Sequence, residues 1–112
     1  IILNNFDQKS HFWPFLVILG TLEKFDIDHR QLGPASTRAL AIALTVNTRI
    51  LNFSIRDNGI GEDGAVALAE MLIENNYIQD LDVSEIKIGK RGSDALFQML
   101  LENTTVQKLG TS

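Results

Sequence analysis

The chain has 112 residues, 45% of them hydrophobic and 21% charged, and a formal net charge of −4. This composition is typical of one globular domain, or a piece of one, and not of a disordered segment. The acidic balance argues against a nucleic-acid binder, and the absence of cysteine excludes disulfides and thiolate metal sites. No apolar run approaches the roughly 20 residues of a membrane span. We therefore expect a cytoplasmic protein that binds neither nucleic acid nor membrane.

Residues 1–21 do not share the pattern of the rest of the chain. They hold four of its aromatic residues, Phe6, Phe12, Trp13 and Phe15. Terminal units of repeat proteins are often atypical because they must cover an open core. We predict an atypical N-terminal repeat or cap at 1–21, which is a more common role for Trp13 than ligand binding.

From residue 22 onward the sequence repeats with a period of 28. The copies are 22–49, 50–77 and 78–105, and 106–112 begins another; their first residues are Leu22, Ile50, Ile78 and Val106. The second and third copies are identical at 10 of 28 positions, where chance would give roughly two. We expect the chain to be a fragment of a longer array.

Each copy has a strand-like first half and a helix-like second half. Apolar and polar residues alternate in 53–55 and 81–83, as in a strand with one buried face. In the second copy Ala65, Leu68, Ala69 and Leu72 follow helical spacing. Strand, turn and helix repeated in one direction predict an α/β solenoid, with parallel strands on the concave face and helices on the convex face.

The turns and helix ends also recur. Gly33-Pro34, Gly61 and Gly89 mark the turns from strand to helix, and proline is well tolerated at a helix start. Asn47, Asn75 and Asn103 lie near the expected helix ends. Asparagine tolerates the left-handed conformation, so we predict left-handed C-caps there.

The second copy resembles the leucine-rich repeats of the ribonuclease-inhibitor type. Residues 50–60 match the strand and turn of that motif, and Gly64, Leu68 and Leu72 match its helix. The resemblance covers residues 22–112 and implies a leucine-rich repeat solenoid. The motif's asparagine, which bonds turn backbone groups in the family, is present only as Asn58. Because other residues occupy its place in the first and third copies, we expect those turns to be shaped differently.

Three segments are similar to tropomodulin and leiomodin repeats: 53–55, 67–72 and 103–109. Proteins of that family cap actin filaments, so the resemblance implies actin as a possible partner. Some leucine-rich repeat proteins instead activate small GTPases, which leaves GTPase activation as another alternative.

Two motifs suggest chemistry that their context does not favour. Residues 59–64 spell the glycine fingerprint of dinucleotide sites, but Glu62 and Asp63 would repel a pyrophosphate at that helix start. Asp26, Asp28 and His29 could suggest a metal site. In a stacked array of repeats Arg56 would lie beside Asp28, which favours an ion pair over a metal site. We expect no cofactor, metal, small-molecule substrate or enzymatic activity.

The strand residues that point away from the core remain as the candidate site. The predicted partner-binding residues are Lys24, Asp26, Asp28, Asn52, Ser54, Arg56, Asp80, Asp82, Ser84 and Glu85. With Asp57 and Lys108 this face has six acids against three bases, an excess of three negative charges. We predict a protein-interaction module that binds a basic patch on a protein partner. The alternative is a face that only keeps the protein soluble.

Overall fold

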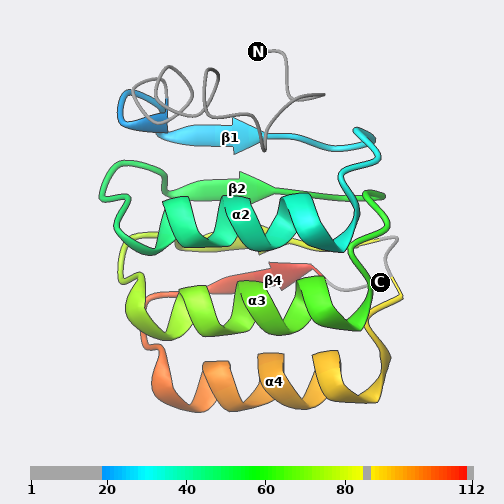
Figure 1. The fold of residues 1–112 in the computed structure, drawn as a ribbon. Helices are drawn as coiled ribbons and strands as arrows, with labels where there is room; N and C mark the ends of the chain where they lie inside the picture. Colours follow the sequence, from blue (N-terminus) through cyan, green and yellow to red (C-terminus); the bar gives the residue numbers. More distant parts are fainter. Residues whose placement is uncertain (1–18, 85–86, 111–112) are drawn as a thin grey trace.

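Strands and helices alternate along the chain in the computed structural model, which describes residues 19–84 and 87–110. The elements are β1 (Lys24–Asp26), α2 (Gly33–Thr45), β2 (Asn52–Ser54), α3 (Gly61–Glu74), β3 (Asp80–Asp82), α4 (Gly89–Glu102) and β4 (Lys108–Gly110). Figure 1 shows the helices stacked one beside another in a layer of their own, in front of the strands. Residues 1–18 of the predicted N-terminal cap lie outside the described residues.

The four strands form one parallel sheet in the order β1-β2-β3-β4. The register aligns Lys24, Asn52, Asp80 and Lys108, each 28 residues from the next. Parallel neighbours need a crossover connection, and α2, α3 and α4 are those connections. The predicted α/β fold is confirmed as a four-stranded parallel sheet with three helices.

The core lies between the sheet and the helices. Phe25 and Phe53, at the centres of β1 and β2, stack with ring centroids 5.6 Å apart. Leu68 of α3 is fully buried, as the helical spacing predicts. One strand and one helix cannot enclose such side chains by themselves, so adjacent units must pack together. None of the helices in the described ranges is both long and apolar enough to cross a bilayer.

The helix-end asparagines act through their side chains and not through their backbone. Asn75 and Asn103 have extended backbone conformations, with φ of −83° and −96°. The prediction of left-handed C-caps is wrong for both, and also for Asn47, which does not have a positive φ. The Asn75 amide donates to the carbonyl oxygens of Leu44 (2.7 Å) and Asn47 (3.1 Å). Asn75 thus satisfies carbonyl groups at the end of α2, and Asn103 does the same for Leu72 at the end of α3.

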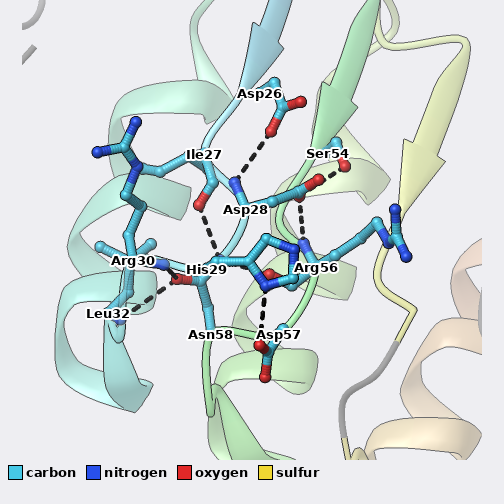
Figure 2. Close-up of polar contacts among 10 residues, drawn as sticks. All are labelled: Asp26, Ile27, Asp28, His29, Arg30, Leu32, Ser54, Arg56, Asp57 and Asn58. Carbon is cyan, nitrogen blue, oxygen red and sulfur yellow. Dashed lines mark hydrogen bonds and ion pairs between the residues drawn. The ribbon is translucent and has the colours of Figure 1, made fainter.

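The first two turns follow the same backbone path, although only the second has the motif's asparagine. His29 and Asp57 occupy equivalent places and both have left-handed backbones, with φ of 59° and 53°. Asn58 explains the likeness because its side chain reaches the preceding turn (Figure 2). It accepts the Arg30 N–H at 2.8 Å and donates to the Ile27 carbonyl oxygen at 2.9 Å. The expectation of a differently shaped first turn is therefore wrong. The equivalent place in the third turn, residue 86, lies outside the described residues.

Candidate functional site

The sheet face that points away from the helices contains a shallow hollow of about 380 Å³. Phe25, Phe53 and Leu81 turn inward at the strand centres, so their sequence neighbours turn outward. The polar and charged residues that line the hollow are Lys24, Asp26, Asp28, Asn52, Ser54, Arg56, Asp80, Asp82 and Lys108. We call this surface the sheet face.

Eight of the ten predicted partner-binding residues line the hollow. Of the other two, Ser84 lies beside the sheet face and donates its backbone N–H to Asp82 Oδ1 at 2.9 Å. Glu85 lies outside the described residues. The period of 28 brings the eight together because it sets the strand register.

Hydrogen bonds order the acidic side chains of β1 and the residues after it (Figure 2). Asp26 Oδ1 accepts the backbone N–H of Asp28 at 3.0 Å. Asp28 Oδ1 accepts the Ser54 hydroxyl at 2.7 Å and the Arg56 backbone N–H at 2.6 Å. The Arg56 guanidinium is directed to the next strand, where its Nε lies 3.9 Å from Asp82 Oδ2. The expected contact of Asp28 with Arg56 thus forms through the backbone, and the ion pair involves Asp82.

The surroundings of Asp82 favour its ionised form. Partial burial raises its pKa and is the largest single effect, but hydrogen bonds from Ser84 oppose it. The charges of Arg56 and Lys108 add to that opposition, so the pKa of Asp82 lies below its ordinary value of 3.8. The carboxylate is therefore ionised throughout the physiological range.

The hollow is closer to neutral than the whole predicted face. Its acids are Asp26, Asp28, Asp80 and Asp82, against the bases Lys24, Arg56 and Lys108, an excess of one negative charge. Asp57 lies in a turn instead, where its Oδ2 is 2.8 Å from His29 Nδ1. Among the described residues, no group of three histidine or acidic side chains could hold a metal ion.

The glycine motif at 59–64 is part of the repeat architecture. Its two acids, at the start of α3, contact α4: Glu62 accepts the Arg91 backbone N–H at 3.1 Å, and Asp63 pairs with the Arg91 guanidinium at 3.2 Å. These contacts leave two carboxylates where a nucleotide phosphate would have to bind.

Gly110 of β4 was not predicted from the sequence, yet it also lines the hollow. A Cβ atom at this position would lie 3.0 Å from Asp82 Oδ1 and 3.3 Å from the Ser84 hydroxyl oxygen. The missing side chain therefore keeps one side of the Asp82 carboxylate accessible. A signal was present, because Gly110 follows Asp26, Ser54 and Asp82 at the 28-residue period.

No known protein-family profile matches the chain, and no curated protein sequence matches it. Solved structures do match. A structure described as leiomodin-1 actin-binding site 2 is 24% identical with a TM-score of 0.79, covering 100% of this chain and 69% of that one. The tropomodulin C-terminal domain of Caenorhabditis elegans is 15% identical with a TM-score of 0.61, covering 89% and 81%. At these identities the likeness shows a shared fold.

Proposed function

We propose that this chain is a non-enzymatic protein-interaction module that binds its partner through the sheet face. One observation carries the proposal: outward side chains from all four strands gather in one hollow, whose lining contains no residue of α2, α3 or α4. Repeat proteins commonly bind partners on such extended surfaces. We include the predicted Ser84 in the proposed site because its backbone N–H donates to Asp82, and Glu85, outside the described residues, stays a prediction.

The charges of the sheet face support a partner with a basic patch. Arg56 is close to Asp82, and Asp28 is held by Ser54 and the Arg56 backbone. On β3, Asp82 lies beside Gly110 of β4, and Asp80 lies beside Lys108. A lysine or arginine of the partner would interact with these two carboxylates, which mainly accelerates association and selects the partner.

Actin is the partner we propose to test first. The support is the fold shared with a leiomodin-1 structure described as an actin-binding site and with a tropomodulin domain. Capping of filament ends, by analogy with those proteins, is the more specific form of this proposal. We further propose that the described sheet and helices are part of a cytoplasmic leucine-rich repeat solenoid of the ribonuclease-inhibitor type, since the register repeats every 28 residues.

Co-sedimentation with actin filaments tests the proposed partner. The sheet-face variant Asp80→Asn/Asp82→Asn should bind about tenfold more weakly than the unchanged chain. Asp94→Asn/Glu102→Gln is the matched control, because it removes two negative charges from exposed positions of α4. Absence of binding by the unchanged chain, in this assay and in filament-end elongation, would reject actin. Equal binding by all three proteins would reject the sheet face as the actin-binding surface.

Filament-end elongation separates capping from binding along the filament sides. A capping protein slows elongation when it is far less abundant than the actin subunits, whereas a side-binding protein does not. Activation of a small GTPase remains a distinct alternative, and an increase in GTP turnover on addition of the chain would support it.

A further inference from the structure

A second groove lies on the helix layer, between α2 and α3. It has a volume of about 350 Å³ and is lined by Arg38, Ala41, Ile42, Thr45, Ala67, Glu70, Met71 and Glu74. We call this surface the helix groove. Its floor is apolar because Ala41 and Met71 are buried there. The small side chains of Ala41 and Ala67 leave the space between the two helices unfilled.

The wall formed by α2 is unusually apolar for the outer side of a helix. Ile42 lines the groove with 71% of its surface exposed. Val46, which directly follows α2 and lies outside the groove lining, is 79% exposed. At the places 28 residues further on, α3 has Glu70 and Glu74. Outward positions of an amphipathic helix are normally polar, so α2 and the residue that follows it depart from this pattern at two positions one helical turn apart.

The wall formed by α3 is acidic. Glu70 and Glu74 are exposed and lie one helical turn apart, an arrangement in which like charges repel. Within the described residues neither carboxylate takes part in an ion pair. Neither α2 nor α3 has a basic residue in its last turn. The negative ends of both helix dipoles therefore add to the negative potential where the groove meets the C-terminal ends of α2 and α3.

The two ends of the groove have opposite charges, because Arg38 and Glu74 lie at different ends. Arg38 lines the wall in the first half of α2, whereas Glu74 is the last residue of α3. An incoming helix that ran antiparallel to α2 and α3 would place its positive N-terminal end near the glutamates. Its negative C-terminal end would then lie near Arg38. The wall from Arg38 to Thr45 spans about 12 Å, or two helical turns.

We propose that the helix groove binds an amphipathic helix of a protein partner, antiparallel to α2 and α3. Aliphatic side chains at i, i+4 and i+7 of that helix contact Ile42 and the apolar floor. Lysine or arginine residues in its first turns pair with Glu70 and Glu74. This mode of recognition buries one helix face in an apolar groove. The groove lies in the helix layer, so it is a second binding surface, separate from the sheet face.

Two stapled helical peptides test the charge preference by fluorescence anisotropy at low salt. Both have leucine at i, i+4 and i+7; one has lysines beside the first leucines, and the other has glutamates at the same positions. We expect the lysine peptide to bind about tenfold more tightly. Glu70→Lys/Glu74→Lys should reverse the preference, and Ile42→Ser should weaken binding of both peptides. Equal binding of both peptides to the unchanged chain would overturn the proposal.

Amide chemical shifts in nuclear magnetic resonance spectra locate the bound peptide. The proposal expects changes at Ile42, Ala67 and Met71. Changes confined to the exposed Phe97 and Leu101 of α4 would overturn it. So would self-association of the free chain that Ile42→Ser abolishes, because the occupant would then be a second copy. The sheet-face variant Asp80→Asn/Asp82→Asn should bind the lysine peptide like the unchanged chain, which separates this proposal from the proposed function.

Discussion

The side-chain amide of Asn103 donates a hydrogen bond to the backbone carbonyl oxygen of Asn75, 28 residues earlier, at 3.1 Å. Asn75 makes the same bond to the carbonyl oxygen of Asn47, also at 3.1 Å. Each asparagine also accepts backbone N–H groups two and three residues further on. One asparagine side chain per repeat thus links the end of its helix to the segment that leads into the next strand. The same side chain also bonds the preceding repeat.

Replacement of Asn75 by alanine should lower the free energy of unfolding by about 3 kcal/mol, since it leaves buried backbone groups without partners. Asn75 is 1% exposed, and its side chain bonds both Leu44 and Ile78. Urea denaturation followed by circular dichroism measures the change. Gln98→Ala, at an exposed position of α4, should change stability by less than about 0.5 kcal/mol. Similar effects of the two substitutions would contradict the structural role of Asn75.

Leu68→Ala tests the packing of the middle helix. Leu68 is fully buried, so the substitution should reduce stability by about 2–5 kcal/mol through lost burial and the cavity it leaves. Leu101→Ala is the control, because Leu101 is 66% exposed. Thermal or urea unfolding compares the two variants. A loss below about 0.5 kcal/mol for Leu68→Ala would show that the residue is outside the core.

Asp82 should contribute stability that depends on pH. Its pKa in the folded protein is below the ordinary 3.8, so the folded state favours the ionised form. That contribution is complete above the unfolded pKa and disappears as the pH falls through the lower folded value. Asp82→Asn should therefore be less stable than the unchanged chain at pH 7, with a difference that shrinks below about pH 3.8. Urea unfolding at pH 7, 4 and 3 measures it; a constant difference would argue against the lowered pKa.

The period of the sequence predicted most of the fold. Alternation around Phe53 and Leu81 placed the strands, and helical spacing around Leu68 placed α3, because burial imposes these two periods. The same period predicted which polar residues share the sheet face. It did not distinguish an asparagine that caps a helix with its backbone from one that bonds through its side chain. Asn75 and Asn103 recur in the right place for both roles, and only three-dimensional contacts separate them.

Contacts between neighbouring repeats explain the other differences between the sequence-based predictions and the structure. Arg56 had two carboxylates within reach of a stacked array, and the sequence does not determine which one its guanidinium approaches. The shape of the first turn depends on Asn58, which lies in the second copy. The helix groove was also missed, although Ile42 aligned with Glu70 was a visible departure from the repeat.

The most direct test of the sheet face is a quantitative pull-down from cell lysate with three baits. They are the unchanged chain, Asp80→Asn/Asp82→Asn, and the charge-matched control Asp94→Asn/Glu102→Gln. The proposed function predicts at least one protein, actin being the first candidate, that the unchanged chain and the control enrich and the sheet-face variant loses. Retention of every captured protein by the sheet-face variant would contradict it, and the binding surface would then lie elsewhere on the molecule.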